Sequence, residues 1–230
     1  MKNILITGGS EGLGRTIAET FAAQNSWRVC ILGRNAVKTA SVADSLGIEH
    51  VIADVTSFEA LESSVQAVCE KMGKLAVLVN NAGVHIKGSF EDMHPDDIRQ
   101  MVDVNLLGPM LTTRAYLPLL EENARIFNIG SYHGQHPAEG APVYAAAKAG
   151  LGAFNEAFGK GLRRQGVSST LVTIGALETD TQNELGVKTA QAGGLPAGNV
   201  AESLLYFANA PLSMSTEEIV LHGLGRWQHR

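Results

Sequence analysis

The residues Ile4-Leu-Ile-Thr-Gly-Gly-Ser-Glu-Gly-Leu-Gly-Arg-Thr-Ile17 decide the fold, because they join an apolar strand, a glycine turn and a helix. The glycines that matter in this turn are Gly8, Gly12 and Gly14. Small residues there let backbone N–H groups at the start of a helix approach a pyrophosphate. A glycine triplet by itself can be no more than a tight turn. The strand before it and the helix after it favour a dinucleotide site.

Outward from this turn, short apolar runs alternate with segments of helical periodicity. Leu13, Ile17 and Phe21 recur at four-residue spacing, which gives one apolar face of a helix. Short apolar strands joined by helices predict a parallel sheet that is covered on both faces. The predicted strands are residues 3–7, 27–32, 49–52, 75–79, 125–129, 167–174 and 218–221. We therefore expect an α/β doubly wound parallel sheet, Rossmann-like, of about seven strands.

The size of the chain, 230 residues, favours one domain over residues 1–230 rather than two small ones. Residues 184–199 are rich in Gly and Ala, and they predict either a short substrate flap around 181–198 or a plain surface connection. The two cysteines, Cys30 and Cys69, stand in apolar contexts, so we expect two buried free thiols rather than a disulfide.

Charge and hydropathy exclude several classes of partner. A net charge of −5 with scattered Lys and Arg gives no electrostatic footprint for nucleic acid. Apolar runs stay well short of the roughly 20 residues of a membrane span. Residues 1–7 enter a strand directly, without signal-peptide architecture, which predicts a cytoplasmic protein. The seven His are dispersed without a ligand spacing, so no metal site is expected.

Tyr144 and Lys148 stand four residues apart, and Ser131 lies thirteen residues upstream of Tyr144. In a helix the first two share one face, about a turn apart. An ammonium beside a phenol favours the phenolate and lowers the pKa of the phenol from about 10. The pair therefore predicts proton transfer to or from an oxygen near neutral pH.

These residues carry a resemblance to a known family. The spacing Thr-Gly-x-x-x-Gly-x-Gly, the run Asn80-Asn-Ala-Gly83, Asn105, Ser131 and Tyr144-x-x-x-Lys148 resemble the short-chain dehydrogenase/reductase family. The match runs in order from residue 3 to about residue 180, with a closing strand near residue 218.

The resemblance implies a role for each candidate catalytic residue. Tyr144 would donate or accept the proton of a substrate carbonyl or hydroxyl. Lys148 would lower the pKa of the phenol and hydrogen-bond the nicotinamide ribose. Ser131 would hold the substrate oxygen, and Asn105 would position a water that links Lys148 to solvent. Taken singly, each residue has an ordinary structural interpretation; their joint spacing favours the catalytic one.

Further residues are expected to contact the cofactor. Asp54 and Val55 resemble the pair that holds the adenine ring, although Asp54 has the alternative of capping the following helix. Asn81 is expected to steady the centre of the sheet, while the backbone there passes the adenine ribose. The expected cofactor contacts are Gly8, Ser10, Gly12, Leu13, Gly14, Arg34, Asp54, Val55, Asn81, Ala82, Gly83, Tyr144, Lys148, Leu177 and Thr179.

The end of the second strand favours NADP(H) over NAD(H). Gly33 stands where an acidic residue would bind a free ribose 2′-OH, and Arg34 follows it. An Arg can form a fork with a 2′-phosphate. Glu11, inside the glycine turn, argues against NADP(H), since a carboxylate near the 2′-phosphate lowers the affinity for this cofactor. Ile174 replaces a proline that is usual in the family, so we expect a less rigid turn before the contacts of Leu177 and Thr179.

These features together predict an NADP(H)-dependent oxidoreductase that interconverts a carbonyl and an alcohol on a small molecule. Tyr132, His133 and His136 are expected on the substrate side, as wall residues rather than as a second acid/base group. Two alternatives stay open: a dinucleotide-binding sensor without turnover, and an enzyme of dehydration or epimerisation. The resemblance also implies a homodimer or homotetramer, paired through helices over residues 95–120 and 142–165.

Overall fold

The computed structural model describes residues 1–178, 194–211 and 213–223, and its centre is a seven-stranded sheet with parallel pairing throughout. The strand order is β3-β2-β1-β4-β5-β6-β9. Strands β2 and β3 are thus added on one side of β1, and the strands from β4 onward are added on its other side. Such a switch point leaves a crevice at the carboxyl ends of the strands. The predicted doubly wound sheet is confirmed. Its strands are β1 (Lys2–Thr7), β2 (Trp27–Gly33), β3 (Glu49–Ile52), β4 (Leu75–Asn80), β5 (Leu120–Ile129), β6 (Ser168–Ile174) and β9 (Glu218–Leu221).

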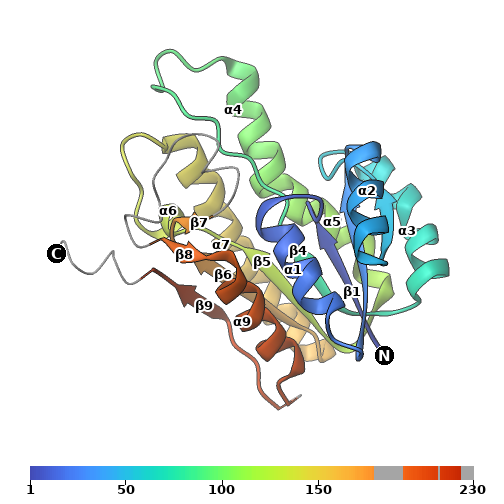
Figure 1. Ribbon diagram of the computed structural model, residues 1–230. Helices are drawn as coiled ribbons and strands as arrows, with labels where there is room; N and C mark the ends of the chain where they lie inside the picture. Colours follow the sequence, from blue (N-terminus) through green and yellow to red (C-terminus); the bar gives the residue numbers. More distant parts are fainter. Residues whose placement is uncertain (179–193, 212, 224–230) are drawn as a thin grey trace.

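Helices cover both faces of this sheet (Figure 1). On one face, α1 (Gly12–Ala22), α2 (Ala36–Leu46) and α9 (Ala197–Asn209) bury Phe21, Val42 and Leu204 in a common core. On the other face, α3 (Phe58–Met72), α5 (Gly108–Tyr116) and α7 (Pro142–Leu162) bury Leu61, Tyr116 and Leu162. None of the helices that the structure describes is long and apolar enough to cross a membrane.

Short elements fill the connections between these layers. They are α4 (Pro95–Val102), a π-helical turn η1 (Asp103–Leu107), 3-10 turns η2 (Leu117–Leu119) and η3 (Arg163–Gln165), α6 (Tyr132–Gln135), and a two-stranded pair of β7 (Leu177–Glu178) with β8 (Leu195–Pro196). The expected flap around 181–198 lies mostly outside the described residues. Within them, Leu195 of β8 pairs with Leu177 of β7, and α9 starts at Ala197.

The ends of several elements are set by side chains next to them. The Asn35 side chain accepts a hydrogen bond from Lys38 N (3.0 Å) and starts α2 directly after β2. Ser57 accepts one from Ala60 N (3.2 Å) and starts α3 after β3. These caps satisfy helix N–H groups that otherwise have no partner. They also place the start of each helix beside the carboxyl end of the preceding strand.

The structure corrects three expectations. The helix predicted over residues 95–120 is interrupted by the π-helical turn η1, and β5 already begins at Leu120 rather than at residue 125. Cys30 is buried as expected, but Cys69 is exposed, and both are free. The reason is the apolar face of α3: it turns Val68 and Met72 inward and leaves Cys69 outside the buried stripe.

A chain of buried amides and hydroxyls joins the centre of the sheet to α7. Asn80 Nδ2 on β4 donates to Asn128 Oδ1 on β5 (2.8 Å), and Asn128 Nδ2 donates to Asn155 Oδ1 on α7 (2.9 Å). Ser169 on β6 donates to the same Asn155 oxygen (2.8 Å). We call these four residues, Asn80, Asn128, Asn155 and Ser169, the amide chain. Because each member is buried, every bond in it counts toward keeping α7 in place.

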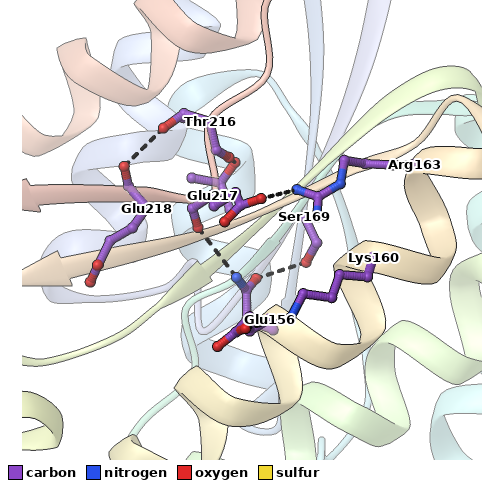
Figure 2. Close-up of polar contacts among 9 residues, drawn as sticks. Glu156, Lys160, Arg163, Ser169, Thr216, Glu217 and Glu218 are labelled. Carbon is purple, nitrogen blue, oxygen red and sulfur yellow. Dashed lines mark hydrogen bonds and ion pairs between the residues drawn. The ribbon is translucent and has the colours of Figure 1, made fainter.

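The last strand is tied to α7 at the end of the amide chain (Figure 2). Asn155 Nδ2 donates to Glu217 O (3.3 Å), and the Glu217 carboxylate forms an ion pair with Arg163 (2.5 Å). Thr216 Oγ1 donates to Glu218 O (2.9 Å) at the start of β9. These contacts hold the edge strand against the helix that carries Tyr144 and Lys148.

Candidate active site

A cleft of about 590 Å³ opens at the carboxyl ends of β1, β2, β4 and β5. The glycine turn lines one part of it, and Tyr144 and Lys148 line another. Most of the expected cofactor residues lie on its walls: Gly8, Ser10, Gly12, Leu13, Arg34, Asp54, Val55, Asn81, Ala82, Gly83, Tyr144, Lys148 and Leu177, together with Asn105. Thr179 lies outside the described residues. Gly14 and Ser131 are placed differently, as described next.

The glycine turn between β1 and α1 needs its glycines for two reasons. Gly8 and Gly12 have positive φ angles, 65° and 48°, which residues with a side chain rarely adopt. Gly14 lies behind the turn, where an added Cβ would stand 2.2 Å from Gly8 O. Gly14 thus lets the first turn of α1 pack closely on β1 and leaves the start of the helix open to the cleft.

The ends of β1 and β4 are locked together beside this turn. Thr7 Oγ1 accepts hydrogen bonds from the backbone N–H groups of Asn81 and Ala82, both at 3.0 Å. The Asn81 side chain donates to Thr7 O (2.9 Å). The backbone that follows β4 is therefore fixed next to Gly8, and Asn81 acts on the turn through its amide.

Tyr144 and Lys148 lie at one end of the cleft, and Ser131 meets the Tyr144 phenol from the side. Tyr144 is on the first turn of α7 and Lys148 is on the next turn, with its Nζ 5.8 Å from the centroid of the Tyr144 ring. Ser131 follows β5, starts α6 and hydrogen-bonds the Tyr144 phenol. Ser131 itself lines a neighbouring cavity of about 290 Å³ along α6, α7 and β6. A substrate oxygen beside Tyr144 would be within reach of both hydroxyls.

Burial decides the proton affinities of this pair. The Lys148 side chain is buried, its Nζ donates to Ile129 O (2.7 Å), and burial lowers its pKa to about 8. Burial raises the pKa of Tyr144, and the hydrogen bond from Ser131 opposes that rise. The sequence predicted a lowered phenol pKa. The structure reverses that direction, because burial disfavours the phenolate and the Lys148 ammonium is turned toward a backbone carbonyl.

Asn105 sits inside the π-helical turn η1 and is fully buried. Its amide nitrogen donates to Val84 O (2.7 Å) and to Met101 O (2.8 Å), and its oxygen accepts from Val84 N (3.2 Å). An added Cβ at Gly83 would lie 3.0 Å from Asn105 Oδ1 and 3.8 Å from Lys148 Nζ. Asn105 therefore holds the segment after β4 close to Lys148.

The far end of the cleft is polar and lies around the end of β2. Asp54 Oδ1 accepts hydrogen bonds from Thr56 N (2.9 Å) and Thr56 Oγ1 (2.7 Å). Ser57 rather than Asp54 caps α3, so the alternative role of Asp54 as helix cap is not what the structure has. Arg34, directly after β2, lines the cleft beside Asp54.

Two residues that lie near the expected ligand were missed from the sequence. Lys38, on the first turn of α2, forms an ion pair with Glu11 and lines the cleft beside Arg34. Its place on the first turn of the helix that follows Arg34 was the available signal. His85 stacks on the Tyr144 ring, with centroids 4.5 Å apart and an interplanar angle of 20°. Only its place two residues after Gly83 hinted at that contact.

The residues expected on the substrate side lie in and beside α6. His133 meets the Tyr144 ring edge-on, with centroids 6.3 Å apart, while Tyr132 and His136 stack on one another at 4.2 Å. Ile174 ends β6 and lines the cleft. Within residues 1–178, 194–211 and 213–223, no three His, Cys, Asp or Glu side chains come together as a metal site would need.

Comparison with known proteins adds to this geometry. Residues 2–190 match the sequence model of a family described as short chain dehydrogenase. An uncharacterised oxidoreductase of Staphylococcus epidermidis is 28% identical over 224 residues, which is 96% of each chain. A 3-oxoacyl-[acyl-carrier-protein] reductase of Bos taurus is 29% identical and covers 86% of this chain and 85% of its own. A short chain dehydrogenase from Burkholderia cenocepacia in complex with NADP superposes with a TM-score of 0.87, at 26% identity over 98% of both chains.

Proposed function

From the premise that this chain belongs to the short-chain dehydrogenase family of oxidoreductases, we propose that it interconverts a carbonyl and an alcohol with NADP(H), with Tyr144 as general acid/base. The observation that carries the proposal is that Tyr144 and Lys148 lie at one end of a cleft whose other walls include the glycine turn, with Ser131 hydrogen-bonded to the Tyr144 phenol. The cofactor, when bound, would supply or accept the hydride. The glycine turn fits such a group, since Gly12 lines the cleft at the start of α1 and, among the described residues, no atom outside the neighbouring chain lies within 4 Å of the place where a Cβ would stand.

The protein's own groups would handle the oxygen and its proton. Ser131 and Tyr144 hydroxyls would both hydrogen-bond the substrate oxygen, which stabilises negative charge as it develops there. Burial keeps the Tyr144 phenol protonated at neutral pH, because it raises a pKa that is already near 10. A protonated phenol can donate its proton to the substrate oxygen as a carbonyl is reduced, and the phenolate that is left can take the proton back in the reverse reaction.

Lys148 and Asn105 would position the reacting groups rather than react. Lys148 Nζ is fixed by Ile129 O and has two further N–H groups to offer, which suits a ribose hydroxyl beside the phenol. Asn105 holds Val84 through two hydrogen bonds, so the backbone that passes the reacting end is rigid. Holding the reacting groups rigidly in the reactive geometry raises the rate of the chemical step.

The preference for NADP(H) over NAD(H) is supported by the charges around β2. Arg34 stands beside the cleft where a 2′-phosphate would lie, and Lys38 adds a second cation. The conflict with Glu11 is eased, because its carboxylate is paired with Lys38 and does not stand alone near the phosphate. The NADP complex of the Burkholderia cenocepacia relative is consistent with this preference.

A spectrophotometric assay tests the proposal. Purified protein, NADPH and a panel of carbonyl compounds are followed at 340 nm, with Tyr144→Phe as the matched variant that lacks only the phenol oxygen. Turnover by the wild type and loss of it in Tyr144→Phe is expected. Tight NADPH binding with no turnover on the whole panel, and no change in Tyr144→Phe, would instead identify a non-catalytic dinucleotide sensor.

The cofactor preference has its own test. Arg34→Ala is expected to weaken NADPH binding roughly tenfold to a hundredfold, the worth of about 1.5–3 kcal/mol for charged hydrogen bonds, and to spare NADH. An unchanged preference would refute the role of Arg34. The cytoplasmic location, the single domain over residues 1–230 and pairing into a homodimer or homotetramer through α4–α5 and α7 stay predictions.

A further inference from the structure

One face of the Tyr144 ring is covered by an imidazole. The His85 ring stacks on it, with the ring centroids 4.5 Å apart and an interplanar angle of 20°. Flat rings attract one another at such a separation when they are offset. His85 lines the cleft, as Tyr144 does. The stack therefore lies inside the candidate active site, and it restricts the plane of the ring that carries the phenol oxygen.

The two stacked rings come from different parts of the chain. Tyr144 is on the first turn of α7, and the N-cap residue of that helix, Ala141, makes no side-chain hydrogen bond to the helix. A helix start without a side-chain cap depends more on packing for its position. His85 supplies such packing from the segment between β4 and α4. The Tyr144 ring is therefore steadied from outside its own helix.

Val84, the residue before His85, is fixed through both of its backbone groups. Its N–H donates to Asn105 Oδ1 (3.2 Å), and its carbonyl accepts from Asn105 Nδ2 (2.7 Å). Asn105 is itself fully buried in η1. Within the part of the chain that the structure describes, the His85 imidazole makes no hydrogen bond of its own. Its place over Tyr144 therefore depends on the fixed backbone at Val84 and on the stack.

The His85 imidazole is neutral at neutral pH. Burial, His133 and Lys87 all lower the pKa of His85 from its usual value of 6.5, because each of them disfavours a positive charge there. The ring therefore acts on the phenol as a flat, uncharged surface. A phenyl ring offers a surface of the same kind, without the ring nitrogens that could donate or accept a proton.

We propose that His85 is a positioning residue, whose ring holds the Tyr144 phenol in its reactive orientation. Asn105 acts on the same phenol through the backbone of Val84 and the stack. The inference rests on the proposed function and adds to it a residue that aligns the general acid/base. Holding a reacting group in line raises the rate of the chemical step. No part of this role requires His85 to touch the substrate or to carry a proton.

Steady-state kinetics with NADPH and 4-nitrobenzaldehyde, an activated carbonyl, test the role of His85. His85→Ala removes the stack and should lower kcat roughly tenfold, because a loosely held phenol is more often out of line. His85→Phe keeps a flat neutral ring, so kcat should return to within about twofold of wild type. The Kd of NADPH should stay within about twofold in both variants, since its phosphates are expected at the glycine turn. A kcat in His85→Phe as low as in His85→Ala would show that the imidazole nitrogens take part, and would refute the positioning role.

A histidine away from Tyr144 gives the control. His94 starts α4, is exposed, and its ring accepts a hydrogen bond from Asp96 N (3.2 Å). His94→Asn removes an imidazole but keeps an acceptor at that cap, so kcat should be unchanged. A fall in kcat as large as that of His85→Ala would mean that the loss is not specific to the stack, and the role of His85 would be refuted.

A double-mutant cycle tests the path from Asn105 to the phenol. In Asn105→Ala, Val84 is released, and His85 loses the fixed backbone that keeps it over Tyr144. Removing His85 in that background should then lower kcat by no more than about twofold, against roughly tenfold in the wild-type background. Thermal unfolding curves establish that each variant is folded at the assay temperature. A roughly tenfold loss in both backgrounds would refute the path through Val84.

NMR measures the stack without turnover and so keeps this inference separate from the enzymatic proposal. A ring that lies over the Tyr144 ring shifts its proton resonances upfield, and the resonances that vanish in Tyr144→Phe identify that ring. The upfield shift should be lost in His85→Ala and Asn105→Ala and kept in His85→Phe and His94→Asn. This pattern, without turnover of any carbonyl compound, would uphold the positioning of Tyr144 and refute the enzymatic proposal. Turnover by a wild type that shows no upfield shift would refute the positioning and leave the enzymatic proposal standing.

Discussion

Replacing Glu11 with Gln is expected to tighten NADPH binding about two- to fivefold and to leave NADH binding unchanged. Glu11 and Lys38 form an ion pair in which the side chains are 64% and 47% exposed. An exposed pair of this kind is worth about 0.2–1 kcal/mol. Gln keeps the shape of the side chain, releases Lys38 toward a 2′-phosphate and removes a nearby negative charge. The upper value, about 1 kcal/mol, corresponds to roughly fivefold in Kd.

Fluorescence titrations with NADPH and NADH measure both constants for wild type, Glu11→Gln, Lys38→Met and the double variant. Lys38→Met should weaken NADPH binding, and Glu11→Gln should then bring a smaller gain, because the cation that it releases is gone. The gain should also shrink when the ionic strength is raised from about 0.01 to 0.15 M, where the Debye length falls from roughly 30 to 8 Å. Equal tightening of NADH, or weaker NADPH binding in Glu11→Gln, would refute the assignment of Lys38 to the phosphate.

Three further predictions concern the reacting end. Tyr144→Phe should lower kcat by roughly 10²–10⁴-fold, the usual worth of a general acid, with NADPH affinity within about twofold of wild type; a comparable loss in NADPH affinity would mean that the phenol serves binding instead. The pKa of Lys148 is lowered to about 8, so the folded protein binds fewer protons than the unfolded chain between about pH 8 and the reference value of Lys near 10.4, and stability should rise over that window. Lys148→Met should flatten this rise in thermal unfolding curves measured across the window, and an equal rise in both proteins would contradict the assignment. Asn105→Ala should lower the Tm by roughly 4–8 °C, since the loss of two hydrogen bonds to Val84 costs about 2 kcal/mol of stability. An unchanged Tm would show that the segment after β4 keeps its position without Asn105.

The sheet could be predicted from the sequence because its strands are buried on both faces. A strand such as β1 or β4 then reads as a continuous apolar run, and the helix after it reads as a four-residue repeat. Boundaries were less well determined where one element passes into another without a breaker. β5 begins at Leu120, because Leu120 pairs with Leu75 across a register shift before the apolar run starts.

Local features that depend on packing escaped the sequence. The π-helical turn around Asn105 leaves no mark in residue spacing, and the bond from the Asn105 side chain to Val84 O joins residues 21 positions apart. The pairing of Glu11 with Lys38 joins residues 27 positions apart on different elements. The sequence showed Glu11 only as an isolated carboxylate in conflict with Arg34. In the structure, Lys38 neutralises the Glu11 carboxylate, so Glu11 no longer opposes a phosphate beside Arg34.

The proton affinities could not be predicted either, and for a related reason. From spacing alone, an ammonium near a phenol lowers the pKa of the phenol. In the structure, both side chains lose water, and Lys148 is turned toward Ile129 O. Burial is a property of the whole fold, so neighbours along one helix cannot reveal it.

The amide chain fixes α7 at Asn155, far from Tyr144, so that any tilt of the helix about this point moves Tyr144. Asn155 lies eleven residues after Tyr144, about 16 Å away at 1.5 Å per residue along the helix. Over a lever of that length, a tilt of roughly 4° moves Tyr144 by about 1 Å, and a misplacement of that size can cost about 10²-fold in rate. The position of Tyr144 against the substrate therefore depends partly on amides about three turns further along the helix. Loss of the hydrogen bonds from Asn155 to Asn128 and Ser169 should therefore act like a change in the active site itself. It should lower kcat more than it weakens the binding of cofactor or substrate.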